Sequence, residues 1–381
     1  MSQEYKICTR CIMDTSVPGI EFDDKGVCNF CAIHDTLEAE YPLNDNGKED
    51  LEKLIDEIKA SGKGKDYDCI IGVSGGTDSI YSLYMAKKYG LRPLAVHFDN
   101  GWNTEIAVSN IENATNILDI DLYTYVVNWE EFKDLQVSFL KASTPDAEAP
   151  TDMGIHAVLY RTAAEEGIKY SISGNSFRTE GVIPHSWGYK DGKYISSVQK
   201  IFGKVKLETF PNVSLFNAIN YILLKRIKIV RLLNYLPYSK EEAKKVLIKE
   251  VGWKDYGGHH HESIYTRFFQ SYYAPVKFNM DRRRVNYSAK ARLGLMTREE
   301  GISHMKELSY DPEILEKDFE YIAKKFDLSL EEFKEIIALP PKKFSDYPTY
   351  NPMLQKLKGI IEFAMKMNLL PGLFQGGIQK R

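Results

Sequence analysis

The stretch DCIIGVSGGTDS, residues 68–79, decides the fold class. Asp68 to Val73 is typical of a buried strand, and a helix is expected from Asp78 to Tyr89. Between them, the adjacent glycines Gly75 and Gly76 permit a tight turn whose backbone N–H groups point at one anion. A helix N-terminus adds partial positive charge at the same place. The stretch therefore predicts a phosphate-binding loop between a strand and a helix.

The same alternation continues on the C-terminal side of the loop. Further strands are expected at residues 92–98, 122–127 and 168–173, and further helices at residues 104–118 and 153–166. Such alternation predicts an α/β fold: a parallel twisted sheet with helices on both faces. Ligands of such sheets bind at the C-terminal ends of the strands.

We divide the chain into four regions. Residues 1–45 form a predicted zinc-binding module, and residues 46–182 the nucleotide-binding domain. Residues 183–310 form a substrate-binding or catalytic region, and residues 311–381 a mainly helical C-terminal region. Within the last region, Ser329 and Glu332 have the spacing of a helix capping box.

The predicted loop lacks a lysine, and the chain contains no G-x-x-x-x-G-K-[ST] sequence, so this is not a kinase-type P-loop. Asp78 would repel a phosphate unless a cation lay between them, which implies Mg²⁺. The candidate nucleotide-binding residues are Ser74, Gly75, Gly76, Thr77, Asp78 and Ser79, and Asp78 is also a candidate catalytic residue. An ordinary Gly-Gly turn is the alternative interpretation.

Polar residues also follow two other strands. His97 and Asp99 end the strand at residues 92–98, where an adenosine would lie, and both are candidate nucleotide-binding residues. Glu180 follows the strand at residues 168–173 and is the candidate second Mg²⁺ ligand, with a solvated loop glutamate as the alternative.

Four of the five cysteines form two C-x-x-C pairs, Cys8 with Cys11 and Cys28 with Cys31. This spacing is typical of a four-thiolate zinc site, which leaves no open coordination position and is structural. A redox pair is the alternative. The unassigned Cys69 lies in the first predicted strand, where we expect a small buried side chain.

A segment dense in histidine and arginine follows in the third region. His259, His260 and His261 are consecutive, and His260 and His261 are candidate catalytic acid–base groups. Arg282, Arg283 and Arg284 are candidate substrate-binding residues, since guanidinium groups hold carboxylates or phosphates with two hydrogen bonds. A second metal site or a solvated basic face remains the alternative.

The bulk composition is that of a soluble protein, with 43% apolar and 27% charged residues and a net charge of -3. We expect no signal peptide, no general attraction to nucleic acid and no membrane. The apolar stretch at residues 215–236 contains several lysines and arginines, which favours an amphipathic helix packed on the domain over one lying on a membrane surface. The paired cysteines favour a reducing compartment, and we infer the cytoplasm.

The S-G-G-x-D-S sequence resembles the loop of PP-loop ATP pyrophosphatases, which hold pyrophosphate while AMP is transferred. Together with the stretches CTRCIMD (residues 8–14), HFDNGWN (97–103), HHHES (259–263) and KFNMDRRR (277–284), it makes the chain similar to the N-acetyl sugar amidotransferases. In one departure, His259 stands where that family has lysine. Glu180 also lies six residues after Gly174, the arrangement that provides a Mg²⁺ ligand in the related NAD synthetase.

The resemblance implies an ATP-dependent conversion of a sugar acetamido group to an acetamidino group, as in the making of O-antigen mannuronic acid derivatives and pseudaminic acid. AMP would activate the amide oxygen, and ammonia would displace it. The implied cofactors are ATP and Mg²⁺, beside the structural Zn²⁺. The acceptor would be an N-acetylated sugar, free or nucleotide-linked.

Ammonia requires a source that this sequence does not provide. No cysteine lies in the setting of a glutaminase nucleophile, so we expect ammonia-supplying partners. The resemblance implies subunits similar to the glutaminase and cyclase halves of imidazole glycerol phosphate synthase. Two rival functions remain open: a tRNA-thiolating PP-loop enzyme and a non-enzymatic adenine-nucleotide-binding module.

Overall fold

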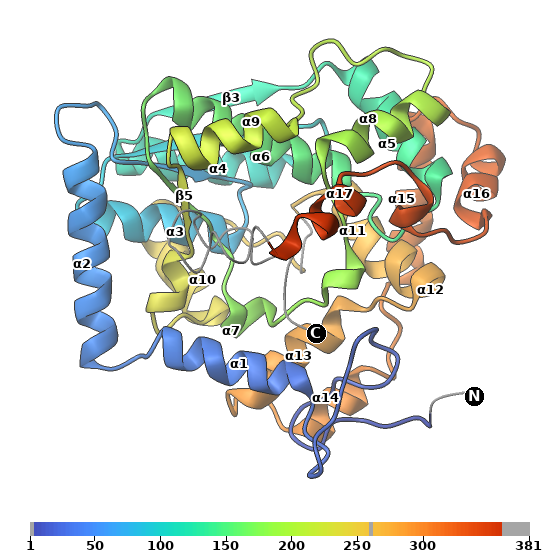
Figure 1. Cartoon of the computed structure of the whole chain (residues 1–381), viewed down its shortest axis with the longest axis horizontal. Coiled ribbons are helices and arrows are strands. Elements are labelled where there is room, and N and C mark those ends of the chain that lie inside the picture. Colours follow the sequence, from blue (N-terminus) through green and yellow to red (C-terminus); the bar gives the residue numbers. More distant parts are fainter. Residues whose placement is uncertain (1–3, 259–261, 360–381) are drawn as a thin grey trace.

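The centre of the molecule is a five-stranded sheet in which neighbouring strands run parallel, in the order β3-β2-β1-β4-β5. The structure is a computed structural model that describes residues 4–258 and 262–359. The strands are β1 (Cys69–Gly72), β2 (Pro93–Asp99), β3 (Leu122–Val126), β4 (Tyr170–Ile172) and β5 (Lys228–Val230). Figure 1 shows the sheet among helices in the upper part of the view.

Helices precede, connect and follow the strands. Up to the end of β4 they are α1 (Asn29–Glu40), α2 (Asp45–Ser61), α3 (Thr77–Lys88), α4 (Glu105–Leu118), α5 (Trp129–Ala142) and α6 (Ala149–Glu165). Between β4 and residue 258 lie α7 (Phe177–Glu180), η1 (His185–Trp187), α8 (Gly192–Phe202), α9 (Leu215–Ile219), η2 (Asn220–Leu224), η3 (Leu232–Tyr235) and α10 (Lys240–Val251). The remainder are α11 (Ile264–Phe268), η4 (Phe269–Tyr273), α12 (Ala274–Phe278), α13 (Arg282–Arg292), α14 (Arg298–His304), α15 (Pro312–Lys325), α16 (Leu330–Ala338), η5 (Phe344–Asp346) and α17 (Asn351–Lys356).

Both faces of the sheet are covered. Successive side chains of a strand point to opposite faces, and in β1 Ile70 packs into one hydrophobic cluster while Cys69 and Ile71 pack into another. Val158 of α6 lies in the first cluster, and Leu83 of α3 lies in the second. The predicted α/β fold with helices on both faces is therefore confirmed.

The sequence predicted the outlines of β1 to β4, α3, α4 and α6 to within a few residues, but it missed α5 and β5. The capping box at Ser329 is confirmed, because its hydroxyl accepts from the Glu332 N–H and the Glu332 carboxylate accepts from the Ser329 N–H. One hydrophobic cluster contains side chains from Cys8 to Ile337. The boundaries of the four predicted regions stay a prediction.

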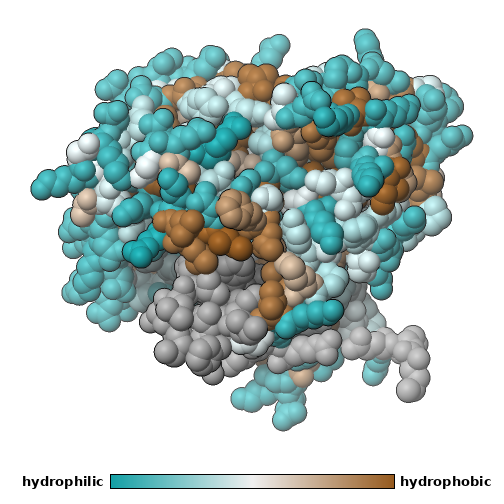
Figure 2. Space-filling view, turned by 45° about the horizontal axis from the view of Figure 1, so that its top comes forward, coloured by the Kyte–Doolittle hydropathy of each residue, from teal (hydrophilic) through white to brown (hydrophobic). Residues whose placement is uncertain are grey.

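The expectation of one amphipathic helix at residues 215–236 was wrong. The segment forms α9 and the π-helical turn η2, reverses direction through Arg226, whose φ is 55°, and then enters the sheet as β5. β5 pairs with β4 in parallel, with Lys228 opposite Tyr170 and Val230 opposite Ile172. Phe216 and Leu224 remain exposed at 77% and 74%. Figure 2 shows apolar patches of this kind on an otherwise hydrophilic face.

Among the described residues, the helices are all too short or too polar to cross a membrane.

The N-terminal segment packs far from its neighbours in sequence. Figure 1 shows α1 beside α13 and α14 at the lower end of the molecule. Arg298 of α14 donates from Nε to the Cys8 carbonyl, and Ile12 N–H donates to the Ser288 hydroxyl. The first region of the chain is thus held by residues from the end of the third.

A substitution at Gly154 of α6 would test how closely that helix packs on the sheet. A Cβ at this position would lie 2.2 Å from Cζ of Phe98 on β2. Helix propensity favours alanine by about 1 kcal/mol, but overpacking a core costs about 1–3 kcal/mol. We therefore expect Gly154→Ala to lower the free energy of unfolding in urea by up to about 2 kcal/mol.

Two further variants interpret this measurement. Phe98→Leu should recover part of the loss when combined with Gly154→Ala. Gly301→Ala is the matched helical control. Its Cβ would lie 3.3 Å from Cγ2 and 3.5 Å from Cδ1 of Ile12, which is far less crowded than the 2.2 Å at Gly154. A Gly154→Ala protein more stable than the parent would contradict the described contact.

Candidate functional site

The predicted phosphate loop lies between β1 and α3, and hydrogen bonds to its own serine hydroxyls fix its shape. Ser74 N–H donates to the Ser79 hydroxyl at 3.2 Å, and Gly76 N–H donates to the Ser74 hydroxyl at 3.3 Å. Ser79 Oγ in turn donates to the Gly76 carbonyl at 3.1 Å. The loop therefore has a fixed shape at the N-terminus of α3, where backbone dipoles favour an anion.

Gly75 is required by the conformation of this loop. Its φ is +79°, and a Cβ there would lie 2.2 Å from the Ala107 carbonyl oxygen of α4. Its own carbonyl accepts from Trp253 Nε1 at 2.9 Å and from Asn110 Nδ2 at 3.3 Å. Glycine alone suits a position with this backbone geometry and this close approach.

Asp78 faces a lysine that the sequence did not single out. Its Oδ2 lies 2.9 Å from Lys240 Nζ, and its Oδ1 accepts from the Tyr238 hydroxyl. Burial alone would lower the pKa of Lys240, but the carboxylates of Asp78, Glu180 and Glu262 raise it above its ordinary value. Lys240 is therefore charged and stands among three carboxylates.

Glu180, the other predicted metal ligand, lies at the same place. α7 carries it, and Asn175 Nδ2 donates to its Oε2 at 2.8 Å. The backbone after β4 packs closely against the start of α3, because a Cβ on Gly174 would lie 3.0 Å from the Asp78 backbone carbon. The structure thus brings Asp78 and Glu180 together around Lys240.

His97 and Asp99 are engaged within the fold. His97 is 6% exposed, and its Nδ1 lies 3.0 Å from the Val73 carbonyl. That carbonyl can only accept, so Nδ1 donates and Nε2 accepts from Asn103 Nδ2 at 3.2 Å. Asp99 Oδ1 accepts from the Gly101 N–H at 2.9 Å. Both residues shape the end of β2 beside the phosphate loop, and their contact with a nucleotide stays a prediction.

A short segment connects the phosphate loop to a second polar group. Glu262 Oε1 lies 3.4 Å from the position of a Cβ on Gly76, and Ser263 pairs with Asn103 in an antiparallel bridge. From the same segment, Thr266 Oγ1 donates to Glu148 Oε1 at 2.8 Å. Residues 262–266 therefore touch the loop at one end and Glu148 at the other.

Glu148 belongs to a group of six charged or titratable side chains that we call the mixed-charge cluster. Asp152 Oδ2 lies 3.2 Å from Lys190 Nζ, and that Nζ lies 3.4 Å from His156 Nδ1. The members are Asp146, Glu148, Asp152, His156, Lys190 and Arg282. Because α6 leads into the parallel strand β4, its N-terminal end lies at the edge of the sheet that carries the phosphate loop.

The surroundings give the members of the cluster different proton affinities. Burial raises the pKa of Glu148 to about 8 and that of Asp146 to about 7. Burial acts in the same direction on Asp152, but the charges of Lys190 and Arg282, with the hydrogen bond from Lys190, hold its pKa below the ordinary value. The charge of Lys190, with burial, lowers the pKa of His156 to about 4, so this imidazole is neutral.

The three predicted arginines have different surroundings. The charge of Arg282 acts on all three carboxyls of the mixed-charge cluster. Arg283 pairs with Asp281 at 2.7 Å, and Arg284 pairs with the buried Asp14 at 2.7 Å. His260 and His261 lie outside the described residues.

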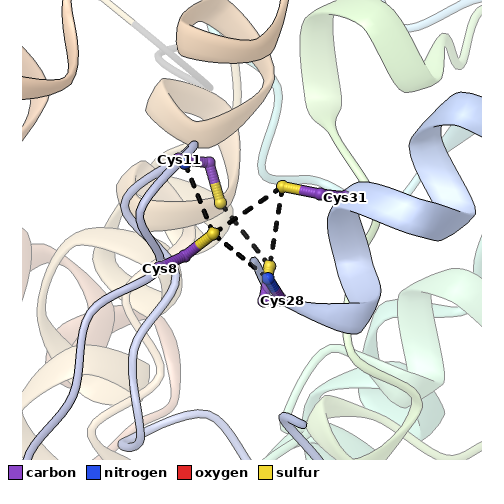
Figure 3. Close-up of side chains that lie close together, drawn as sticks. All are labelled: Cys8, Cys11, Cys28 and Cys31. Carbon is purple, nitrogen blue, oxygen red and sulfur yellow. Dashed lines mark hydrogen bonds between the residues drawn. The ribbon is translucent and has the colours of Figure 1, made fainter. Parts of the chain in front are cut away.

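The predicted four-cysteine site is assembled. Figure 3 shows Cys8 and Cys11 on one loop and Cys28 and Cys31 at the start of α1, with their sulfurs turned toward one another. The four Sγ atoms lie within 4.8 Å of one another and all four residues are buried. Backbone N–H groups of Cys11 and Cys28 donate to Cys8 Sγ at 3.4 and 3.2 Å. The donor set and its shape fit a metal ion.

An arginine from α13 completes the surroundings of the cysteines. Arg292 donates from Nε to Cys31 Sγ at 3.3 Å and from Nη2 to Cys11 Sγ at 3.4 Å. Burial works against its charge, but the cysteine sulfurs raise its pKa above the ordinary value. Arg292 therefore places one positive charge against the thiolates.

Sequence reasoning missed Tyr238, Lys240, Glu148 and Arg292. The tertiary fold brings each of them to its site from a distant part of the sequence. Tyr238 lies 160 residues after Asp78, and Arg292 lies 281 residues after Cys11. No local motif marks such residues.

The C-terminal part of the chain matches a known family. Residues 262–360 fit the model described as the C-terminal domain of LPS biosynthesis protein WbpG-like proteins. This part of the chain is similar to WbpG-like C-terminal domains. The match confirms the family that the sequence resembles. It includes Thr266, which binds Glu148, and Arg292, which binds the cysteines.

Other similarities extend over more of the chain. The uncharacterised protein MJ1599 of Methanocaldococcus jannaschii is 26% identical over 321 residues, which is 81% of this chain and 96% of that protein. The NH3-dependent NAD synthetase of Campylobacter jejuni, at 15% identity, covers 73% of this chain and 94% of its own, with a TM-score of 0.29. The U34-tRNA thiolase NcsA of Methanococcus maripaludis, solved with its [4Fe-4S] cluster, is 16% identical. That match covers 78% of this chain and 88% of the thiolase, with a TM-score of 0.31. At these TM-scores, neither structure bears on the function of this chain.

The contact between Arg292 and the thiolates can be tested directly. We expect Arg292→Met to bind its metal about 10–100-fold more weakly, because two N–H donors and one positive charge are lost beside the ligands. The measurement is competition with a chromophoric chelator. Lys290→Met on the same helix is the matched control, since Lys290 pairs with Glu241 at 3.8 Å and is not at the cysteines. Equal metal affinity in the two variants would contradict a role for Arg292.

Proposed function

We propose that this chain is an ATP-dependent amidotransferase of bacterial surface glycan biosynthesis. It converts the acetamido group of a sugar to an acetamidino group through an O-adenylyl intermediate, with ammonia as the nitrogen donor. The observation that carries the proposal is the lysine-free phosphate loop joined by residues 262–266 to the mixed-charge cluster, within a chain that ends in a WbpG-like domain.

The nucleotide would bind at the phosphate loop. Residues 74–79 offer backbone N–H groups and two serine hydroxyls to the pyrophosphate. Asp78 and Glu180 suit Mg²⁺, which proteins commonly hold through one or two carboxylates and the oxygens of a bound phosphate. Lys240 pairs with Asp78 of this loop at 2.9 Å and would form an ion pair with a phosphate oxygen of the bound nucleotide.

The acceptor would bind beside the mixed-charge cluster. Arg282 and Lys190 offer donors, and the carboxyls offer acceptors for sugar hydroxyls. Attack of the amide oxygen on the α-phosphate releases pyrophosphate and leaves AMP bonded to that oxygen. Ammonia then displaces AMP. Positioning and charge neutralisation are the protein's contribution to both steps.

We also propose that the cysteines hold zinc. Four thiolates at about 2.3 Å from one tetrahedral zinc lie about 3.8 Å apart. The Sγ atoms of Cys8 and Cys31 lie 3.8 Å apart, those of Cys11 and Cys28 3.6 Å, and those of Cys28 and Cys31 3.7 Å. An iron–sulfur cubane would hold the thiolates farther apart, because several irons and sulfides stand between them. Zinc analysis of the purified chain tests this, and iron with visible absorption would contradict it.

The alternative is a tRNA-thiolating enzyme. Sulfur transfer needs a reactive thiol or an iron–sulfur cluster, and Cys69 is fully buried in β1, where burial raises its pKa. The other thiols surround the proposed zinc. These surroundings favour the amidotransferase. Turnover with N-acetylated sugars against turnover with tRNA separates the two functions.

The products of the reaction test the proposal. We expect purified protein with ATP, Mg²⁺, ammonium and an N-acetylated sugar to release AMP and pyrophosphate. Replacement of oxygen by NH in the sugar should appear by mass spectrometry. Glutamine should not replace ammonium unless glutaminase and cyclase-like subunits are added. Formation of ADP and phosphate, or glutamine use by the chain alone, would overturn this mechanism.

Lys240 should contribute to nucleotide binding. We expect Lys240→Met to weaken Mg²⁺-dependent binding of a non-hydrolysable ATP analogue about 10-fold or more, because a charged hydrogen bond is worth about 1.5–3 kcal/mol. Calorimetry gives the affinity. Lys245→Met is the matched control on α10, since Lys245 pairs with Glu242 at 2.7 Å on the exposed face. If both variants bind like the parent, Lys240 has no role in nucleotide binding.

A further inference from the structure

Glu148 occupies a distinctive position among the acidic residues of the site. It is the N-cap residue of α6, yet its side chain makes no capping hydrogen bond. Its Oε1 instead accepts from Thr266, whose hydroxyl lies 3.0 Å from that of Ser263. The carboxylate is thus held by a hydroxyl 118 residues away in the sequence and not by the N-terminus of its own helix.

The groups that face Glu148 come from several elements. Asp146 and Asp152 flank it along the chain, and both raise its pKa, while Arg282 of α13 lowers it. Thr266 of α11 also lowers it through the hydrogen bond, and the fully buried Tyr265 hydroxyl is influenced by its charge. Burial outweighs the favourable contacts. With a pKa of about 8, Glu148 exchanges a proton near neutral pH.

The other acidic groups of the site are less suited to accept a proton. Asp78 is paired with Lys240 at 2.9 Å. Asp152 is paired with Lys190 at 3.2 Å, and its pKa is held low. Asp146 lies against the backbone at Gly188, where a Cβ would come within 2.7 Å of Oδ2. Glu148 combines a hydroxyl partner, proximity to the nucleotide loop through residues 262–266, and no lysine partner at ion-pair distance among the described residues.

We propose that Glu148 is the catalytic base of the amination step, which takes the proton from the ammonia nitrogen as that nitrogen bonds to the adenylylated carbon. The proposal rests on the proposed function and assigns a residue to its second half-reaction. Thr266 is the positioning residue that orients the carboxylate.

The step balances as follows. The nitrogen lone pair forms the new C–N bond, and the π electrons of the activated C=N⁺ group move onto the sugar nitrogen. The attacking nitrogen is now positively charged and transfers one proton to the Glu148 carboxylate. The lone pair that remains on it re-forms a C=N bond while the C–O bond breaks, and AMP leaves with the oxygen and that electron pair. The products are the protonated amidine, AMP and a neutral Glu148 carboxylic acid.

The half-reactions can be measured separately. Exchange of labelled pyrophosphate into ATP reports adenylylation and needs the acceptor but no ammonia. Amidine formation, followed by mass spectrometry, needs both half-reactions. The probes are N-acetylglucosamine, N-acetylmannosamine, N-acetylgalactosamine and their UDP derivatives, and an acceptor that supports exchange in the parent protein is used for the variants.

We expect Glu148→Gln to keep pyrophosphate exchange within about 3-fold of the parent and to lose amidine formation by about 100-fold or more, the usual range for a general base. Glu166→Gln, at the exposed C-terminal end of the same helix, is the matched control and should retain both reactions. Thermal melting confirms that the variants are folded.

The pH profile gives a signature that a merely structural role would not produce. Hydroxylamine replaces ammonia in this assay because it is largely neutral near neutral pH. The base must be ionised, so the rate should rise with pH through about 8, and Glu148→Gln should abolish that rise. Thr266→Val removes a hydrogen bond that stabilises the carboxylate, so its profile should move about one pH unit upward.

The outcomes separate the two proposals. Absence of exchange in the parent protein with every acceptor overturns the proposed function and the role of Glu148 with it. Exchange in the parent, with Glu148→Gln losing exchange and amidine formation equally, leaves the proposed function and overturns the role of Glu148. Normal amidine formation by Glu148→Gln overturns that role as well.

Discussion

The contact between Arg292 and the cysteine sulfurs is the constraint on which the arrangement of the site depends. Four thiolates around a divalent metal carry net negative charge, and Arg292 brings a buried positive charge to 3.3 and 3.4 Å from two of them. The arginine lies at the C-terminal end of α13. The four-cysteine module, residues 8–31, therefore fixes one end of this helix, and the other end carries Arg282 to the mixed-charge cluster.

Between its ends, α13 also sets the position of Glu180. Gly181 has a φ of +73°, and a Cβ there would lie 2.7 Å from the Val285 carbonyl, so α7 and α13 are in backbone contact. From the opposite side, Arg178 of α7 donates to Glu38 of α1 at 3.0 Å. The module thus holds α7 directly through α1 and indirectly through α13. A site formed at the edge of the sheet is supported by residues outside the sheet.

The sequence predicted the parts of this molecule that depend on local patterns. A buried strand followed by Ser74–Ser79 and a helix is visible within a dozen residues, and so is each C-x-x-C pair. The partners of these motifs are not visible, because Lys240 and Arg292 look like ordinary charges on amphipathic helices. The error at residues 215–236 has a related cause. Period and composition gave no sign that three residues, β5, would be drawn to the free edge of β4.

The long sequence separation of the cysteine contacts has a consequence for synthesis of the chain. Both C-x-x-C pairs leave the ribosome well before the residues that contact them. Their partner Arg292 lies 281 residues after Cys11, and Arg298 lies 290 residues after Cys8. At about 5–20 residues per second, the module waits on the order of tens of seconds for the helices that cover it. During that interval Ile12 and Met13, which are fully buried in the folded chain, face water. This segment of the nascent protein is thus exposed to aggregation until α13 and α14 cover it.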